Sequence, residues 1–460
     1  MPAASETIIF ASKALLSDGW ANNVAVHFAK DGRIVSVMPD TFPEADDKHV
    51  GVLLPAPVNL HSHAFQRAMA GMSEWRTSGF DSFWTWRQIM YRFLDILAPE
   101  DIGSITSYVQ MEMLEAGFAA MSEFHYLHHQ KSGEPYENQA ELSGQICSAA
   151  AETGIGLTLL PVLYSYGGCD RRALEAGQLR FGNDFDRFHR LYGGAAKFIK
   201  SLPEDSGLGV APHSLRAVDD HGLAQMVELA GSRPLHMHIA EQTAEVQEIL
   251  AAKGSRPVEW LLDHHSVGPN WCLIHCTQMT GKETEALAKT GAVAGLCPIT
   301  EANLGDGIFS AVQYLTAGGR FGIGSDSNIR ISLSEELRIL EYSQRLRDRM
   351  RACAATSDKS TGRVLFESAT RGGAQAAGRH SGQISVGFYA DLLSLDENAI
   401  DLVGRERDEI LDAFIFVGDD CLVKNVWSAG RHVVTHGKHV KGEAIRANYR
   451  KTMASLRARM

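Results

Sequence analysis

Two histidines stand two residues apart at the end of an apolar run, in the stretch PAPVNLHSHAFQRAMAG that spans residues 55–71. Side chains two positions apart on a β-strand point to the same side, so His61 and His63 can bind one metal ion together. His238 and Asp326 also follow strand-like runs further along the chain. Three imidazoles and one carboxylate suit Zn²⁺ or another borderline divalent cation and leave one coordination position for water. We therefore predict one divalent ion per chain, with Zn²⁺ favoured and Fe²⁺ also tolerated by these ligands.

The alternation of side chains along a strand leaves one choice of ligand open. His236 lies on the same face of its run as His238, so either could bind the ion. His236 stands deeper in the run, and we expect it to pack in the core.

Two further side chains could move protons beside such an ion. Glu241 stands three residues after His238, just past the strand, where its carboxylate could reach a water molecule on the metal. His275 ends the next strand-like run and could polarise the same reacting group. Alone, Glu241 would be interpreted as a helix cap or a surface carboxylate. Next to a metal we expect it to transfer protons, with Asp326 as the base that accepts the proton of the water.

Eight strand-like runs alternate with helix-like segments through the centre of the chain, which is the pattern of a (β/α)8 barrel, an α/β fold. The runs are APVNLHSH, AAMSEFHY, GLTLLPVLY, LGVAPHS, PLHMHIAE, WCLIHCT, AVAGLCPIT and FGIGSDSN. No glycine-rich phosphate loop follows the first run, which disfavours an open doubly wound sheet. The candidate metal-binding and proton-transferring residues all stand at the carboxyl ends of these runs, where such barrels place their active sites. The pair His128–His129 falls in a predicted loop and is expected to be solvated.

Both ends of the chain read as short strands around glycine turns. Examples are NVAVHFAKDGRIVSVMP near the start and NVWSAGRHVVTHGKHV near the end. Each end is incomplete alone, so we expect residues 1–54 and 376–460 to form one small β-sandwich domain. Residues 55–375 would then form the catalytic barrel inserted between them.

The composition excludes several classes of protein. The 460 residues carry a formal net charge of −11, which argues against a nucleic-acid partner. The seven cysteines are scattered without a CxxC pair, which favours reduced thiols in a cytoplasm. The start MPAASETIIF lacks the pattern of a signal peptide, and no apolar run approaches the roughly 20 residues needed to cross a bilayer. We expect a soluble cytoplasmic protein that does not bind membranes.

The motifs NLHSH, HMHIAE, LIHCT and GIGSDSN, flanked by a split β domain, resemble those of the amidohydrolase superfamily. The resemblance implies a set of metal ligands and catalytic neighbours, namely His61, His63, His238 and Asp326 as ligands, with Glu241 and His275 beside them. Dinuclear members carry a carboxylated lysine at the end of the fourth strand. Here that strand reads APHSLRAV without a lysine, so the chain resembles the mononuclear deaminases.

Four longer motifs, HSHAFQRAMAGM, FWTWRQIMYRF, SEFHYLHH and APHSLRAV, resemble the formiminoglutamate deiminase family. That resemblance implies hydrolysis of N-formimino-L-glutamate to N-formyl-L-glutamate and ammonia in histidine degradation, by a homodimer. The implied substrate-binding residues are Gln66, Arg87, Tyr126, His213 and Arg216. Arginine binds carboxylates in a bidentate manner, which suits a dicarboxylate substrate. Arg87 lies in an aromatic-rich insertion, FDSFWTWRQIMYRFL, expected to cover the site, and strand alternation does not separate His125 from Tyr126.

Two alternatives remain at this stage. Another deaminase of the superfamily would act on a heterocycle such as guanine, cytosine or an adenosine derivative, and would not need paired arginines. A catalytically inactive barrel used as a scaffold would not need a complete set of metal ligands.

Overall fold

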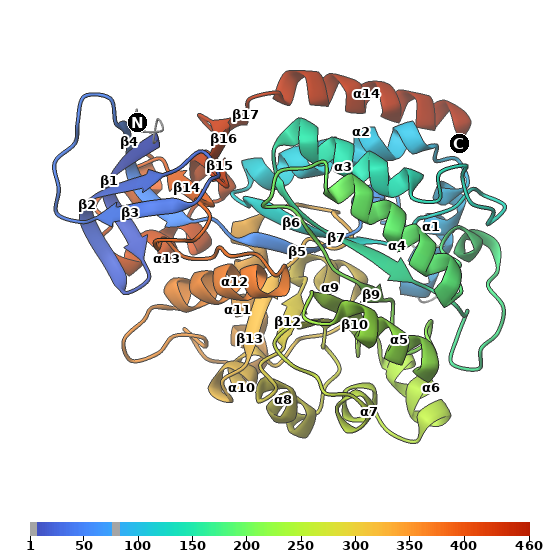
Figure 1. Cartoon of the computed structure of the whole chain (residues 1–460). Coiled ribbons are helices and arrows are strands. Elements are labelled where there is room, and N and C mark those ends of the chain that lie inside the picture. The colour runs from blue at the N-terminus through green and yellow to red at the C-terminus, as the bar shows by residue number, and fades with distance from the viewer. Residues whose placement is uncertain (1–6, 76–82) are drawn as a thin grey trace.

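The computed structural model describes residues 7–75 and 83–460. Residues 1–6 of the predicted N-terminal unit and residues 80–82 of the predicted covering insertion lie outside this part. Figure 1 shows a sheet made from both chain ends on one side of the molecule and a larger helix-covered barrel on the other. The predicted α/β class, with a barrel and a β unit from both ends, is confirmed.

The central barrel has eight positions of parallel strands, one of which is divided between β8 and β9. Two sheets, in the orders β5–β6–β7–β8 and β10–β11–β12–β13, are joined by parallel bridges between Ser62 and Asp326 and between Val210 and Leu235. The strands are β5 (Val58–Ser62), β6 (Ala120–His125), β7 (Gly156–Leu163), β8 (Gly207–Leu208) with β9 (Ala211–Pro212), β10 (Leu235–Ile239), β11 (Trp271–His275), β12 (Val293–Leu296) and β13 (Arg320–Ile323). All residues of β5, β6, β7 and β10 are buried, as expected of parallel strands covered on both faces.

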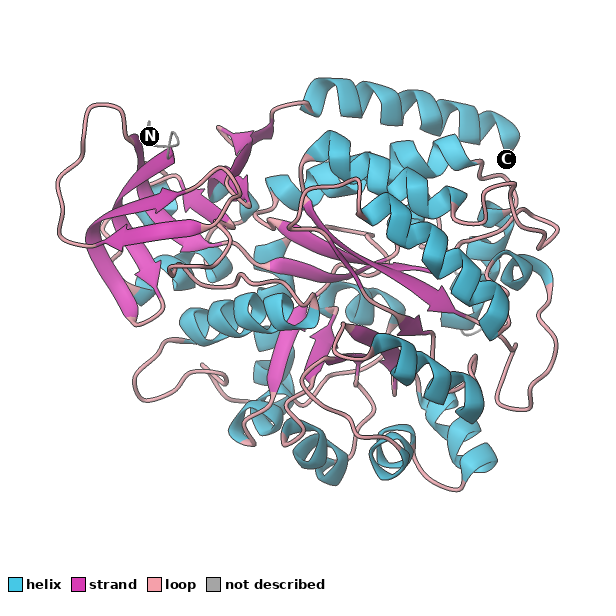
Figure 2. Ribbon diagram, viewed as in Figure 1, coloured by secondary structure: helices cyan, strands magenta, loops and turns pink. Residues whose placement is uncertain are grey.

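Helices surround the barrel and fill the connections between its strands (Figure 2). They are α1 (Phe83–Leu94), α2 (Pro99–Glu115), α3 (Glu141–Thr153), α4 (Phe185–Ile199), α5 (Asp220–Ala230), α6 (Thr243–Lys253), α7 (Pro257–His264), α8 (Gly281–Ala288), α9 (Pro298–Leu304), α10 (Ala311–Thr316), α11 (Leu333–Asp348) and α12 (Thr361–Ala376). Short 3₁₀ helices are η1 (Ala64–Met69), η2 (Ala176–Arg180), η3 (Ile400–Leu402) and η4 (Asp420–Leu422). Local signals set many ends: Thr280 caps α8 by accepting from the backbone N–H of Glu283, and Gly154 ends α3 at φ +77°.

The chain ends form one eight-stranded sheet in the order β17–β16–β15–β14–β4–β1–β2–β3. Its strands are β1 (Thr7–Leu16), β2 (Gly19–Phe28), β3 (Ile34–Met38), β4 (Lys48–Pro55), β14 (Leu392–Leu395), β15 (Val423–Ser428), β16 (Arg431–Thr435) and β17 (Lys438–His439). The N- and C-terminal halves meet where β4 pairs antiparallel with β14. The sheet has its own core, which includes Ile9, Val26, Leu53 and Trp427.

Two helices that follow this sheet's strands in the sequence pack on the barrel. Helix α13 (Asp408–Phe416) contacts α11 and α12, and α14 (Gly442–Arg459) lies along α2, where Tyr449 stacks on Tyr108 at 3.9 Å (Figure 1). The predicted domain boundaries at 54/55 and 375/376 stay a prediction. Strand β4 ends at Pro55 and helix α12 ends at Ala376, close to both positions.

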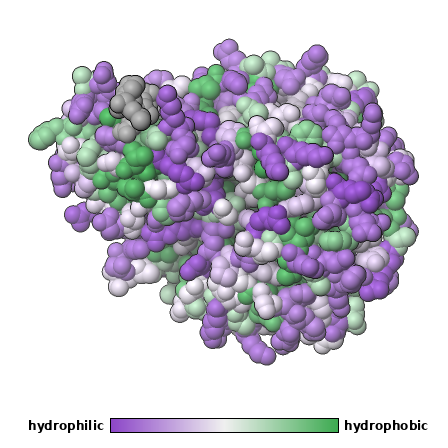
Figure 3. Space-filling view, viewed as in Figure 1, coloured by the Kyte–Doolittle hydropathy of each residue, from purple (hydrophilic) through white to green (hydrophobic). Residues whose placement is uncertain are grey.

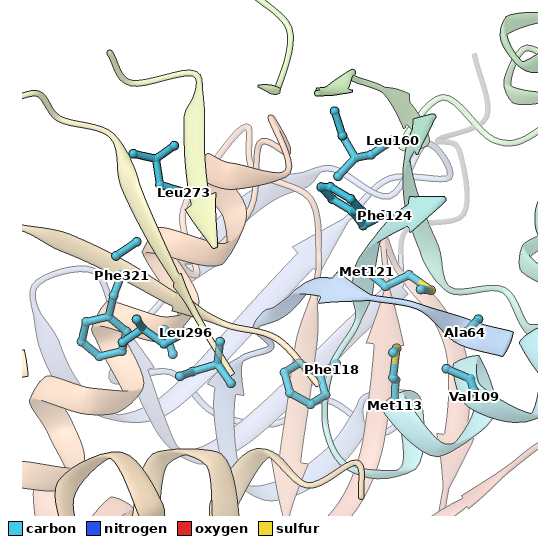
Figure 4. Close-up of a cluster of buried hydrophobic side chains, with 14 of the residues drawn as sticks. Ala64, Val109, Met113, Phe118, Met121, Phe124, Leu160, Leu273, Leu296 and Phe321 are labelled. Carbon is cyan, nitrogen blue, oxygen red and sulfur yellow. The ribbon is translucent and has the colours of Figure 1, made fainter. Parts of the chain in front are cut away.

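The main hydrophobic core lies between the barrel strands and the surrounding helices. Figure 4 shows Val109 and Met113 of α2 beside Met121 of β6, with Phe118 nearby. Each of these four side chains is fully buried. This packing fixes the strands against the helices, so the strand ends form a rigid base for the side chains that project beyond them.

The exterior is mainly hydrophilic on the face that Figure 3 displays, where hydrophobic residues occur in small patches. No helix in the described part of the chain is both long and apolar enough to span a membrane.

A buried ion network joins the terminal sheet to the barrel. The guanidinium of Arg379 donates to Asp205, which follows α4, at 2.9 Å and to Asp391, which precedes β14, at 2.6 Å. Arg431 of β16 also donates to Asp205, at 2.7 Å. Burial opposes ionisation of Asp205, but hydrogen bonds from the two arginines hold the pKa of its carboxyl below the usual range. The network therefore stabilises the junction through charges that are hydrogen-bonded on both sides.

We expect Asp205→Asn to lower the free energy of unfolding by about 3 kcal/mol, because it leaves the buried arginines short of one counter-charge. Folding lowers the pKa of Asp205, so its contribution is complete above its unfolded pKa of about 4 and is lost as the pH falls through the folded-state pKa. Denaturant unfolding at pH 7 and at about pH 3, below the unfolded pKa of Asp205, measures both effects. Asp348→Asn, on the surface beside Arg347, is the control and should change nothing. Equal stability of Asp205→Asn and wild type at pH 7 would contradict the role of this network.

Candidate functional site

Four side chains converge at the carboxyl ends of three barrel strands. His61 lies in β5 and His63 directly follows that strand, His238 lies in β10, and Asp326 follows β13. One ligand atom from each lies within 4.8 Å of the others, and all four residues are buried. The backbone brings β5 and the Asp326 turn together, because the N–H of Asp326 donates to the carbonyl of His61 and the N–H of His63 donates to the carbonyl of Asp326, each at 2.9 Å.

The hydrogen bonds of these rings show that their free nitrogens face one another. The Nδ1 of His63 lies 3.0 Å from the carbonyl of Phe124, and the Nδ1 of His238 lies 3.1 Å from the carbonyl of His213. A carbonyl only accepts, so each Nδ1 carries the proton and each Nε2 presents a lone pair. Those Nε2 atoms lie 3.2 Å from Asp326 Oδ1 and 3.1 Å from His61 Nε2, respectively. The lone pair of His63 Nε2 and the carboxylate oxygen of Asp326 repel at this distance unless a cation lies between them, so this donor set fits a metal ion.

Burial keeps this cluster in the protonation state that metal ligands require. Desolvation lowers the pKa of His61 to about 3 and holds the pKa values of His63 and His238 below the usual range of histidine. Burial opposes ionisation of Asp326, yet the hydrogen bond and attraction from His61 and the attraction of His63 hold the pKa of its carboxyl below the usual range. Neutral imidazoles and an ionised carboxylate are the forms that bind a divalent ion.

Glu241 and His275 lie beside the predicted ligands. His275 Nε2 is 3.7 Å from Glu241 Oε1, and His275 Nδ1 is 3.2 Å from Glu301 Oε1. Burial raises the pKa of Glu241 to about 7, against the attraction of His275. Burial disfavours the charged ring of His275, but the nearby carboxylates, first Glu241 and then Glu301, raise its pKa to about 10. A carboxyl that titrates near neutrality can both accept and donate a proton during a reaction.

Buried glutamates hold the loops that carry these residues. Glu123 accepts from the N–H of Ala64, which follows His63, at 2.7 Å. Glu245 accepts from the N–H groups of Ala240 and Glu241 at 3.1 and 2.9 Å. The backbone positions of Ala64, Ala240 and Glu241 therefore depend on two buried glutamates.

The turn after β13 has an unusual backbone that a polar network stabilises. Asp326 and Asn328 adopt positive φ angles of 47° and 54°, which side chains other than glycine rarely do. Asn59 donates to Ser325 Oγ at 2.8 Å, Ser325 donates to Asn328 at 2.6 Å, and Asn328 donates to Ser62 Oγ at 3.1 Å. These buried contacts tie the GSDSN motif to β5 and hold Asp326 beside its two histidines.

A single cavity contains the cluster and the predicted substrate-binding residues. Its walls include His63, Gln66, Arg87, Tyr126, His213, Arg216, His238, Glu241, His275 and Asp326. Within it the amide of Gln66 donates to the hydroxyl of Tyr126 at 2.6 Å. Tyr126 therefore lies in the wall, whereas the ring of the adjacent His125 packs near His128 with a centroid separation of 4.9 Å. His236 lies away from the cluster and contacts the carbonyl of Ala376, in agreement with its predicted place in the core.

Sequence reasoning missed several residues of this cavity, which are Trp86, Met90, Tyr91, Tyr164, Phe181, Leu304 and Ser327. Tyr164 follows β7, and its hydroxyl accepts from Arg87 at 2.9 Å and from Gln178 at 3.1 Å. Its position at the end of the strand-like run GLTLLPVLY was a usable signal. Residues such as Phe181 and Leu304 gave no such signal, because they come from loops and helix ends.

The expectation that His128 and His129 are solvated is wrong. Both are buried, with 1% and 0% of their surface exposed. His128 Nε2 lies 3.0 Å from the carbonyl of Val162, and His129 Nε2 lies 2.9 Å from the side-chain oxygen of Asn183. The loop after β6 folds inward between β7 and η2, where one ring nitrogen of each histidine has a hydrogen-bond partner inside the protein.

The chain belongs to the amidohydrolase family, whose model matches residues 52–433. The resemblance to formiminoglutamate deiminases that the motifs predicted is confirmed as well. Residues 6–51 match the N-terminal domain of formimidoylglutamate deiminase HutF, formimidoyl being a synonym of formimino. The whole chain is 46% identical to formimidoylglutamate deiminase of Pseudomonas aeruginosa, over 95% of this chain and 96% of that one.

Other relatives place the chain in the wider family. An amidohydrolase crystal structure from Brucella melitensis superposes with a TM-score of 0.94 at 46% identity and covers 98% of this chain and 99% of that one. An adenosine deaminase from Xanthomonas campestris with bound zinc shares the fold, with a TM-score of 0.82 at 21% identity and 98% coverage of both chains. The 8-oxoguanine deaminase of Pseudomonas aeruginosa is 26% identical over 80% of this chain and 81% of its own.

We expect the purified protein to contain about one equivalent of a divalent metal and to lose thermal stability when a chelator removes it, because the converging lone pairs then repel. Elemental analysis and thermal unfolding before and after addition of Zn²⁺ measure this. His61→Gln should lower the metal content well below one equivalent. His264→Gln, on the exposed end of α7, should leave it unchanged. A full equivalent in His61→Gln would place the ion elsewhere.

Proposed function

We propose that the protein hydrolyses N-formimino-L-glutamate to N-formyl-L-glutamate and ammonia. The observation that carries this proposal is that two arginines, Arg87 and Arg216, share one cavity with the buried cluster of three histidines and an aspartate. The substrate has a linear amidine at one end and two carboxylates, so it requires a hydrolytic centre and fixed cations within reach of each other. The similarity to a formimidoylglutamate deiminase supports the same assignment.

The two arginines serve as carboxylate-binding groups in this proposal. Only 7% of the surface of Arg216 is exposed, and charge-assisted hydrogen bonds are stronger in such buried surroundings. Arg87 reaches the cavity from α1 and is oriented by the hydroxyl of Tyr164. Gln66, Tyr126 and His213 complete the polar wall with a hydrogen-bonded pair and an imidazole. This arrangement favours a short dicarboxylate over a flat, uncharged heterocycle.

One divalent ion would be held by His61, His63, His238 and Asp326. We propose Zn²⁺, because the donor set is rich in nitrogen and a relative of the same fold binds zinc. Fe²⁺ would fit the same ligands. When bound, such an ion acts as a Lewis acid that makes water a nucleophile at neutral pH. We further propose a homodimer that resides in the cytoplasm.

The side chains then divide the remaining chemistry. Asp326 accepts a proton from the attacking water, and the water oxygen bonds to the formimino carbon. Glu241, whose pKa of about 7 allows both protonation states, delivers a proton to the amidine nitrogen as the water oxygen adds to carbon. Asp326 then passes the proton it took from the water to the same nitrogen, and the C–N bond breaks to release ammonia. Glu241 takes up the proton of the new hydroxyl group as the formyl C=O bond forms. His275 stabilises the charge that develops at the tetrahedral carbon. The Nδ1–H groups of His63 and His238 keep their rings oriented throughout by donating to backbone carbonyls.

We expect the metal-loaded protein to release ammonia from N-formimino-L-glutamate and not from guanine, cytosine or S-adenosylhomocysteine. A coupled ammonia assay on this panel separates the proposed reaction from heterocycle deamination. Turnover of a heterocycle alone would contradict the proposed substrate, and a metal-loaded protein inactive on the panel would indicate a different role.

Arg87→Met and Arg216→Met should each raise KM for this substrate about tenfold to a hundredfold, since each removes a charged hydrogen-bond donor worth roughly 1.5–3 kcal/mol. Steady-state kinetics measures the change. Arg330→Met removes an exposed arginine that pairs with Glu335 and serves as the control with unchanged KM.

Glu241→Gln should reduce kcat by at least about a hundredfold while the metal content stays the same, because it removes the group that transfers the proton. Steady-state rates and elemental analysis on the same preparation test this. Near-normal turnover in that variant would assign proton transfer to another residue.

A further inference from the structure

His275, at the end of β11, lies between two buried carboxylates. Its Nε2 faces Glu241 and lines the cavity, and its Nδ1 faces Glu301 on the opposite side at 3.2 Å. Glu301 lies in α9, is 4% exposed and does not line the cavity. It therefore contacts the ring from behind and does not reach the reacting atoms.

The carboxylate of Glu301 is itself fixed. Its Oε1, the atom that faces His275, also accepts from the backbone N–H of Cys297 at 2.9 Å, and the N–H of Glu301 donates to the carbonyl of Cys297 at 2.9 Å. Cys297 directly follows β12. The acceptor that His275 uses is thus anchored to the neighbouring barrel strand.

The backbone at His275 does not set the direction of the ring in the way a regular strand would. His275 and Cys276 have positive φ angles of 72° and 53°, so the chain turns sharply where the side chain projects. The ring also stacks on His238, with centroids 5.6 Å apart and planes at 17°. Stacking leaves rotation within the plane free, and a hydrogen bond at Nδ1 removes that freedom.

We propose that Glu301 is a positioning residue for His275. By accepting the Nδ1–H, it fixes the orientation of the ring, so that Nε2 points at the reacting group. In such a carboxylate–histidine pair, the carboxylate orients the imidazole and so assists the chemistry without contacting the substrate. The effect on turnover rests on the proposed function, whereas the hydrogen bond does not.

A double-mutant cycle tests the proposal, run with N-formimino-L-glutamate or whichever panel substrate the wild type hydrolyses. Glu301→Gln should lower kcat about tenfold to a hundredfold, with KM changed by less than about threefold and the metal content unchanged. In a His275→Gln background the same substitution should change kcat by less than about twofold, because its effect passes through the ring. Losses that multiply in the double variant would overturn the proposal.

A matched control and a second readout separate positioning from folding and from the choice of substrate. Glu283→Gln replaces another buried glutamate, which caps α8 and pairs with Arg256, and should leave kcat unchanged. In zinc-loaded protein with ¹⁵N-labelled histidine, the Nδ1–H resonance of His275 should be present, absent in His275→Gln and shifted in Glu301→Gln. If Glu301→Gln does not fold, Glu301→Asp, which withdraws the carboxylate by one methylene, should show the same shift and the same non-additivity. A wild-type spectrum without that resonance would overturn the proposal even if the substrate assignment held. So would a second equivalent of metal that the wild type binds and Glu301→Gln does not.

Discussion

The crowding of ligand atoms from three imidazoles and one carboxylate, all within 4.8 Å of one another, is the constraint on which the rest of this structure depends. His63 and His238 are committed to their tautomers by backbone carbonyls, so their Nε2 atoms have no proton to share. A cation relieves this arrangement, and the surrounding protein must hold the ligands together until one binds. The buried contacts among Asn59, Ser325 and Asn328 and the glutamates behind the loops supply that rigidity.

The sequence was sufficient to predict the barrel and the metal cluster, because both depend on short-range patterns. Eight apolar runs mark the strands, and polar residues at their ends mark the active face. The choice between His125 and Tyr126 could not be made, since β6 ends at His125 and the alternation of side chains ends with it. Tyr164 and Glu301 were not singled out, and the burial of His128 was predicted wrongly. Their positions depend on how loops fold over the barrel, which no local periodicity encodes.

Local charge in the cavity differs from the charge of the whole molecule. The chain carries a net charge of −11, yet Arg87 and Arg216 line the cavity. Close by, burial raises the pKa of Asp306 to about 9 and the pKa of Glu241 to about 7, so these carboxyls resist ionisation where an anionic substrate would approach. The net charge of the molecule therefore affects the binding of large partners such as nucleic acids, whereas a few desolvated groups determine which small molecule enters the cavity.

The sheet of the chain ends has a consequence for biosynthesis. Strand β4 lies between β1 and β14, and β14 begins at Leu392, beyond the whole barrel. During synthesis, the apolar strand VGVLLP therefore has one edge unpaired until the whole barrel has been made. An unpaired apolar edge invites association with other chains, so a product truncated before Leu392 would expose a site for aggregation. The edge of β4 is covered only when β14 has been made and pairs with it.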